Sequence, residues 1–323
     1  MKCWLSIGLG AWLVAGSIGT HAQWKPEKAV EIVTSSAQGG SNDKVARTIQ
    51  AVMQEHKLVP TAVSVLNKPG GNQTLARVYL NQHPGDAHFF DIGNPTLVGN
   101  HISGITPISH RDVTPIALLI SEYTAFTVKA DSPFKTLGDL IAALKKDPDS
   151  VSVGISNRGG TNHLTLALTA KAAGIDPKRL KVVVFKSNAE STTALMGGHI
   201  QLVAASVPSI IGQVQAGGAR VIAVGSPKRM TGVLASVPTV REQGLNVSLD
   251  NWRALIGPKG LSAAQVAYWE GVLAKVVETA EWKKTLDANN WSASFLRSRE
   301  FAKFLDAEYD ETKGIMSDLG LIK

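Results

Sequence analysis

The sequence has almost no cysteine: its 323 residues contain a single one, Cys3. Disulfides, cysteine-bound metals and cysteine nucleophiles are therefore excluded from the whole chain after residue 3. Cys3 also precedes the apolar segment at residues 5–18, whereas a lipid-attachment cysteine would stand at the end of such a segment. We therefore predict a protein that carries no covalent lipid.

Long hydrophobic runs are also missing. The segment at residues 5–18 is the most apolar of the chain, and it is shorter than the roughly 20 residues that a bilayer span needs. Lys2 precedes it, and a small residue, Ala22, ends it. This pattern predicts a secretory signal peptide at residues 1–22, cleavage before Gln23 and export of the mature chain.

Motifs of enzymes and of nucleic-acid binding are absent as well. The chain has no Gly-x-Ser-x-Gly, His-Glu-x-x-His or Gly-x-x-x-x-Gly-Lys motif, and its eight histidines are scattered without ligand spacing. The net charge of +7 is spread among acids, with no basic stripe between aromatic residues. We predict no catalytic residues, no metal, no cofactor and no nucleic-acid partner; the positive charge is compatible with an anionic small molecule.

What the chain does contain is an alternation of short apolar runs and amphipathic segments. This order predicts an α/β protein, with sheets flanked by helices. About 300 residues remain after the signal peptide, enough for two domains. The runs that we interpret as buried strands are residues 63–66, 89–92, 151–155, 182–185, 202–205, 221–224 and 254–257.

Three predicted strands lead into a short polar loop that opens a helix. The loops occupy residues 35–42, 156–163 and 186–188, and Ser41 or Asn42 is predicted to cap the first helix. A helix N-terminus has unpaired amide donors and a partial positive charge, so each loop can hold a carboxylate or phosphate without a cationic side chain. Gly and Ser also make ordinary turns, but three such loops at the carboxyl ends of strands predict a ligand cleft.

The mature chain resembles a known family, the tripartite tricarboxylate transporter receptors, also called Bug receptors. No single motif is decisive, but their order and spacing together are specific. The motifs are AQGGSND at 37–43, NKPGG at 67–71, DSPFKTL at 131–137, GGTNHL at 159–164, GGHI at 197–200, VPTV at 237–240 and EQGL at 242–245.

The resemblance implies a two-lobed periplasmic solute-binding protein of the type II kind, a monomer with a cleft between its lobes. It would capture a small organic carboxylate and deliver it to membrane permease subunits. With the strand pattern, it implies one lobe at residues 23–124 plus 250–323 and another at 125–249. The expected ligand-binding residues are Ala37, Gln38, Gly39, Gly40, Ser41, Asn42, Asn94, Thr96, Asn157, Gly160, Thr161, Asn162, His163, Lys186, Ser187 and Ser206.

Several alternatives stay open at this stage. A receptor that serves a signalling protein would have the same fold, and a periplasmic enzyme is the rival class. Trp252 is compatible with a cleft wall or with the core, and His163 is predicted to be a neutral, packed imidazole because the helix N-terminus disfavours its charged form. Many family members have an acid where this chain has Gln201, which favours purely anionic ligands over amino acids. The sequence does not identify the ligand, its affinity, or the permease or sensor served.

Overall fold

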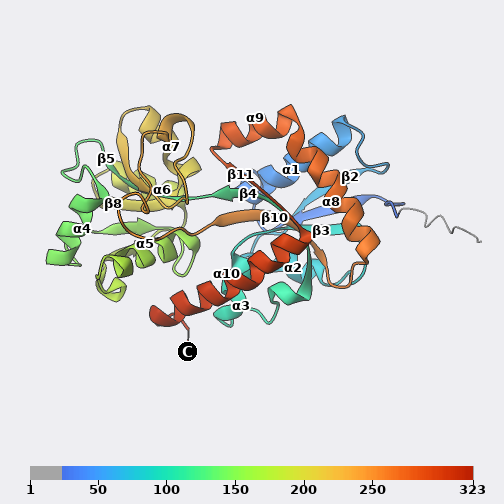
Figure 1. Cartoon of the computed structure of the whole chain (residues 1–323), viewed down its shortest axis with the longest axis horizontal. Helices are drawn as coiled ribbons and strands as arrows, with labels where there is room; N and C mark the ends of the chain where they lie inside the picture. Colours follow the sequence, from blue (N-terminus) through green and yellow to red (C-terminus); the bar gives the residue numbers. More distant parts are fainter. Residues whose placement is uncertain (1–23, 323) are drawn as a thin grey trace, which may run out of the picture.

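The computed structural model describes residues 24–322, so the predicted signal peptide and the start at Gln23 lie outside the described residues. Two β-sheets, each covered by helices, lie side by side along the long axis of the molecule (Figure 1). This arrangement confirms the predicted α/β fold with two lobes. Among residues 24–322, no helix combines the length and apolar character needed to cross a membrane.

The first sheet has six strands in the order β11-β4-β10-β3-β1-β2. Strand β1 pairs in parallel with β2 and β3, whereas β10 is antiparallel to β3 and β4, and β11 is antiparallel to β4. The strands are β1 (Val30–Thr34), β2 (Val63–Asn67), β3 (Phe89–Gly93), β4 (Val113–Glu122), β10 (Asn251–Pro258) and β11 (Ser292–Arg297).

The second sheet has five strands in the order β7-β6-β8-β5-β9 and follows the same plan. Strand β6 is parallel to β7 and β8, and β5 is antiparallel to β8 and β9. The strands are β5 (Thr124–Lys129), β6 (Val153–Ile155), β7 (Val182–Val184), β8 (Leu202–Ser206) and β9 (Ala219–Val224).

Only part of each sheet is parallel, although alternating strands and helices predict fully parallel sheets. The reason lies where the chain passes between the sheets. Strand β4 ends at Glu122 and β5 begins at Thr124, so one nearly continuous extended segment serves both sheets. The chain returns through β10, which therefore runs opposite to β4, its neighbour in the first sheet.

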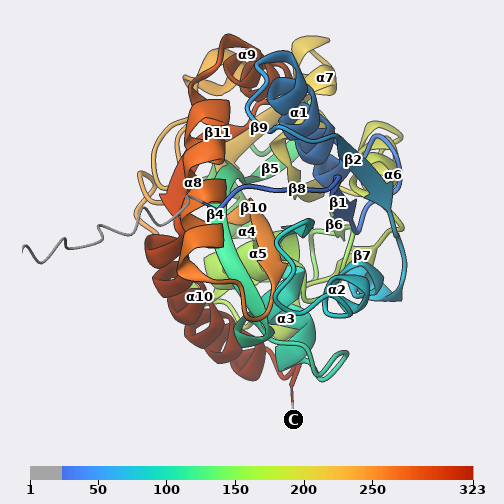
Figure 2. The same ribbon diagram turned by 90° about the vertical axis from the view of Figure 1, so that its right-hand side faces the viewer.

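Helices cover both faces of the first sheet, as the view along the long axis shows (Figure 2). Helices α1, α8 and α9 bury one face with Trp269, Trp282 and the apolar side of α1. Helices α2, α3 and α10 bury the other face, where Phe301 of α10 packs against Trp252 of β10. Within residues 24–322 the α-helices are α1 (Ser41–Glu55), α2 (Leu75–Leu80), α3 (Thr96–Ile102), α4 (Leu137–Lys146), α5 (Thr161–Ala172), α6 (Asn188–Met196), α7 (Val207–Gln215), α8 (Ala263–Glu278), α9 (Ala280–Asn289) and α10 (Ser298–Asp318).

The long helix α10 contacts both lobes. It packs on β4 of the first sheet, and its last turns carry Ile315 and Met316 against Leu164 of α5. Lys171 of α5 and Asp318 of α10 form an ion pair across the same contact. The end of α10 therefore lies against the second lobe (Figure 1).

Candidate ligand-binding cleft

A cleft of about 410 Å³ lies between the two sheets. Its walls come from the first lobe, from the second lobe and from the strands that join them. This volume is within the range of small-molecule sites in proteins. The lining is polar and contains seven asparagines: Asn72, Asn94, Asn100, Asn157, Asn162, Asn188 and Asn251.

Two loops, one from each lobe, have nearly the same backbone conformation. Gly39 has φ +82° and Gly159 has φ +80°, in the left-handed region that favours glycine. The next residues, Gly40 and Gly160, are extended N-caps with φ and ψ of −71° and 165°, and of −79° and 165°. Helices α1 and α5 thus begin with the same turn, although they belong to different lobes.

Neither of these helices is capped by a side chain at its N-cap. The prediction that Ser41 or Asn42 caps α1 is therefore wrong, because glycine occupies the cap and Ser41 is already the first helical residue. Ser41 and Thr161, the first residues of α1 and α5, both line the cleft. The first amides of a helix have no acceptor within the helix, so both helices offer unused donors at the cleft.

Each loop is fixed from behind by one side chain of its own helix. The amide of Gly39 donates to Oδ2 of Asp43 at 2.8 Å, and the amide of Gly159 donates to Nδ1 of His163 at 3.0 Å. Burial alone would raise the pKa of Asp43, but hydrogen bonds from Arg47, Gly39 and Asn67 outweigh it and lower the pKa. Asp43 and His163 thus hold the two turns in matching positions.

Nδ1 accepts a hydrogen bond in this geometry, so His163 must be neutral at that nitrogen. Burial, assisted by the charge of Arg158, lowers the pKa of His163 to about 4. The prediction of a neutral, packed imidazole is confirmed.

Half of the sequence-predicted site residues line the cleft, and half do not. Ala37, Gln38 and Gly39 lie exposed at the loop tip, whereas Asn42 is buried and donates to Ser35. Ligand contact by all sixteen of these residues stays a prediction. The residues in the lining are Ser41, Asn94, Thr96, Asn157, Gly160, Thr161, Asn162 and Ser206; those outside it are Ala37, Gln38, Gly39, Gly40, Asn42, His163, Lys186 and Ser187.

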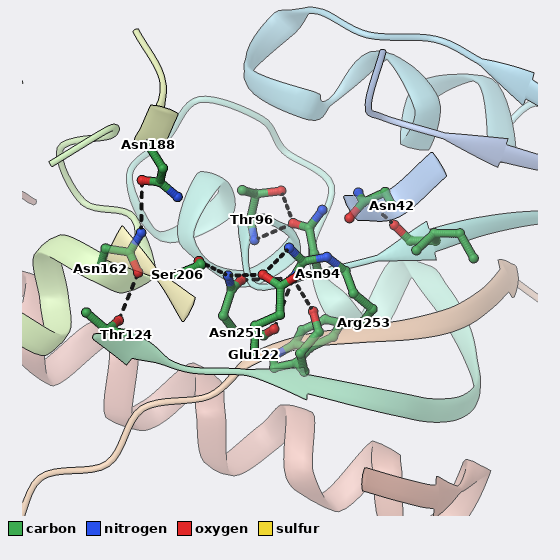
Figure 3. Close-up of polar contacts among 12 residues, drawn as sticks. Asn42, Asn94, Thr96, Glu122, Thr124, Asn162, Asn188, Ser206, Asn251 and Arg253 are labelled. Carbon is green, nitrogen blue, oxygen red and sulfur yellow. Dashed lines mark hydrogen bonds and ion pairs between the residues drawn. The ribbon is translucent and has the colours of Figure 1, made fainter. Parts of the chain in front are cut away.

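The third loop differs from the other two because a side chain, that of Ser187, caps its helix. Oγ of Ser187 accepts from the amide of Glu190, and the Glu190 carboxylate accepts from the amide of Lys186. The side chain of Lys186 is exposed. Of this loop, only Asn188 reaches the cleft, where Oδ1 accepts from Nδ2 of Asn162 (Figure 3).

The base of the cleft holds a charged group that sequence reasoning missed. Glu122, at the end of β4, pairs with Arg253 of β10 at 3.3 Å, and Asn251 bonds to both (Figure 3). Glu122 and Asn251 are opposite each other in the ladder, so their side chains share the face toward the cleft. The sequence signal is the triplet Asn251-Trp252-Arg253, in which two polar residues flank the tryptophan.

Trp252 itself is buried in the core, which decides between its two interpretations. Its Nε1 donates to Oε1 of Glu308 at 3.3 Å, and Glu308 lines the cleft. Burial raises the pKa of Glu308 to about 8 and the pKa of the neighbouring Asp250 to about 7. Glu308 is therefore mostly protonated at neutral pH.

One side-chain group in the described part of the chain has the spacing of a cation site. It consists of Glu55, His56 and Glu281, all exposed, at the end of α1 and the start of α9. None of these residues lines the cleft.

The fold and the cleft define a two-lobed solute-binding protein. Residues 45–321 match the family model described as "Tripartite tricarboxylate transporter family receptor", and the chain belongs to this family.

Three solved structures support the same fold. A TctC solute-binding protein from Polaromonas, without ligand, is 26% identical, with 91% of this chain and 99% of that chain covered and a TM-score of 0.80. A Rhodopseudomonas palustris protein with adipate is 23% identical. The match covers 91% of this chain and 98% of that chain, with a TM-score of 0.77. MatC from Rhodopseudomonas palustris with bound malate is 21% identical. The match covers 90% of this chain and 99% of that chain, with a TM-score of 0.72.

Proposed function

We propose that this protein is an exported, periplasmic receptor that captures a small organic carboxylate in its cleft and delivers it to the permease subunits of a tripartite tricarboxylate transporter. The observation that carries the proposal is the pair of glycine-capped helix starts that reach the cleft from opposite lobes. Each presents backbone donors that no side chain caps, and an anion is the ligand that such donors suit.

The charges of the lining favour the same conclusion. The charged side chains of the lining are Glu122, Arg158, Arg253 and Glu308. With Glu308 mostly protonated, these side chains sum to one positive charge at neutral pH. The partial positive charges of the helix starts of α1 and α5 add to it, so the cleft attracts an anion.

The ligands of two relatives of the same fold agree with this chemistry. One structure contains adipate and another contains malate, both of them dicarboxylates. In the cleft of this protein, amide and hydroxyl donors can replace the water around a carboxylate without a fixed cationic clamp.

We expect carboxylates to stabilise the purified mature chain against thermal unfolding. A ligand at 100 times its dissociation constant adds about 2.7 kcal/mol to the free energy of unfolding. Malate, adipate, citrate and benzoate would be compared with adipamide, which has no charge. Stabilisation by adipamide alone, or by none of the acids, would contradict the proposal.

We also expect the two lobes to close on the ligand. Ser41 and Thr161 come from different lobes, so a ligand that uses both helix starts binds the closed form better and shifts the population toward it. The moving units that we propose are residues 23–124 with 250–323 and residues 125–249. Small-angle scattering should give a smaller radius of gyration with saturating ligand. An unchanged radius with a confirmed ligand would mean that the lobes do not move.

A further inference from the structure

The pair of Glu122 and Arg253 leaves one acceptor and one donor unused at the base of the cleft. Oε2 of Glu122 accepts from Asn251 at 3.2 Å and from Arg253 at 3.3 Å, but Oε1 has no partner within residues 24–322. The NH1 group of Arg253 makes three hydrogen bonds, two to Asn251 and one to the carbonyl of Trp252. Nε of Arg253 also has no acceptor within residues 24–322.

Both side chains line the cleft and are almost fully buried. The exposed fraction is 2% for the side chain of Glu122 and 9% for that of Arg253. A buried polar atom without a partner costs free energy, and the cost is larger when the group is charged. Such atoms on the wall of a ligand cleft are where a ligand gains most by supplying the missing partners.

A simple carboxylate can pair with only one of the two unpaired atoms, Nε of Arg253, and not with Oε1 of Glu122. Its oxygen can accept from Nε of Arg253, but it brings a second negative charge toward Glu122 and leaves Oε1 without a donor. A hydroxyl or ammonium group beside the carboxylate removes this conflict, because it donates to Oε1 while the carboxylate accepts from the guanidinium.

We propose that Glu122 and Arg253 select carboxylates that carry a hydroxyl or ammonium group. The inference rests on the proposed function, because it assumes that the cleft binds carboxylates. It also replaces the expectation drawn from Gln201, that amino acids are disfavoured. Gln201 lies outside the cleft lining, where Oε1 accepts from the amide of Ser152 at 2.8 Å. The acid that we propose to face the ligand is Glu122, which is in the lining.

Isothermal titration of the wild-type protein with two matched series tests this inference. One series is succinate, malate and aspartate; the other is adipate, 2-hydroxyadipate and 2-aminoadipate. In at least one series, the hydroxy or amino acid should bind about ten- to a hundredfold more tightly than its parent, the range for a hydrogen bond to a charged group. Equal affinity across both series would overturn the inference and leave the proposed function standing. If none of the six binds, the inference fails, and the proposed function is then decided by citrate and benzoate in the thermal assay.

The substitution Glu122→Gln makes the test sharper. With its amide oxygen toward Arg253, glutamine places an NH₂ donor where Oε1 was, so the parent acid should gain affinity and the amino acid, whose ammonium group can only donate, should lose it. A hydroxyl can also accept from this NH₂, so the ranking compared here is that of the parent acid and the amino acid. Glu242→Gln is the matched control: Glu242 also pairs with an arginine, Arg229, but outside the cleft. The order of ligand affinities of Glu242→Gln should be the same as that of the wild-type protein. An unchanged ranking in Glu122→Gln would overturn the inference, and the wild-type series decides alone if this variant does not fold.

Discussion

Valine at Gly40 or at Gly160 is expected to weaken carboxylate binding by about a hundredfold or more, the loss of two hydrogen bonds to a charged group. A Cβ on Gly40 would meet Cβ of Ser36 at 2.9 Å, and a Cβ on Gly160 would meet Cβ of Asn157 at 3.2 Å. The loop must move in either case. The amides that open α1 and α5, at Ser41 and Thr161, would then no longer point at one ligand position.

The matched control is Gly271→Val in α8, where an added Cβ has no atom within 4 Å. Its binding should equal that of wild type. Lys186→Ala should also have little effect, since this side chain is exposed and outside the lining. Titration calorimetry of the four variants measures the ranking. A larger loss in Lys186→Ala than in the two cleft glycine variants would show that a side-chain cation, and not the helix starts, holds the anion.

Stability should fall as the pH rises from 6.5 to 8.5, because buried acids must ionise in the folded state. Burial raises the pKa of Glu308 to about 8, the pKa of Asp250 to about 7 and the pKa of Asp91 to about 6. The folded state therefore binds more protons than the unfolded state between the ordinary carboxyl pKa and these values. The free energy of unfolding decreases with pH across that window.

Below pH 6.5 the titration of His163 has the opposite effect on stability. The lowered pKa of His163 means that only the unfolded state takes up this proton, so His163 stabilises the fold above its ordinary pKa and loses that contribution as the pH falls toward 4. The window from 6.5 to 8.5 is thus controlled by Glu308 and Asp250. Since one pKa unit corresponds to about 1.4 kcal/mol, the expected loss there is about 3 kcal/mol, of which Glu308 contributes about two thirds.

The substitution Glu308→Gln should remove most of the pH dependence of the free energy of unfolding between pH 6.5 and 8.5. Glutamine keeps an acceptor for Nε1 of Trp252 but has no proton to lose. Urea unfolding at constant ionic strength, at several pH values between 6.5 and 8.5, gives the comparison. The control Glu242→Gln, at an exposed ion pair, should keep the wild-type slope. A variant Glu308→Gln as pH-sensitive as wild type would mean that Glu308 is already ionised in the folded protein.

Local features of the fold could be predicted well from the sequence. A Ser or Thr followed three residues later by an acid or an amide predicts a capping box, and this pattern occurs at Thr136, Ser187 and Ser262. The boxes at Thr136 and Ser262 form, with the hydroxyl and the side chain three residues later both accepting from backbone amides. At Ser187 only half of the box forms, because Glu190 bonds to the amide of Lys186 instead. These interactions span three or four residues, so the local sequence determines them.

The residues at the base of the cleft could not be predicted in this way. Glu122 and Arg253 are 131 positions apart and meet only because β4 and β10 pair antiparallel in one register. The strand at residues 113–122 was not among the predicted strands, although its apolar run is readable. Without that strand, nothing in the sequence brings an acid to the arginine of β10.

By itself, the sequence determined most of the short buried strands, the two glycine turns that open α1 and α5, and the family. Each depends on backbone preferences or on motifs within a few residues of one another. Only the tertiary structure decided that the two turns face one cleft and that Glu122 and Arg253 lie together at its base. The physical reason is that these contacts follow from strand register and from the passage of β4 and β10 between the lobes, and residues far apart in the chain do not encode that geometry locally.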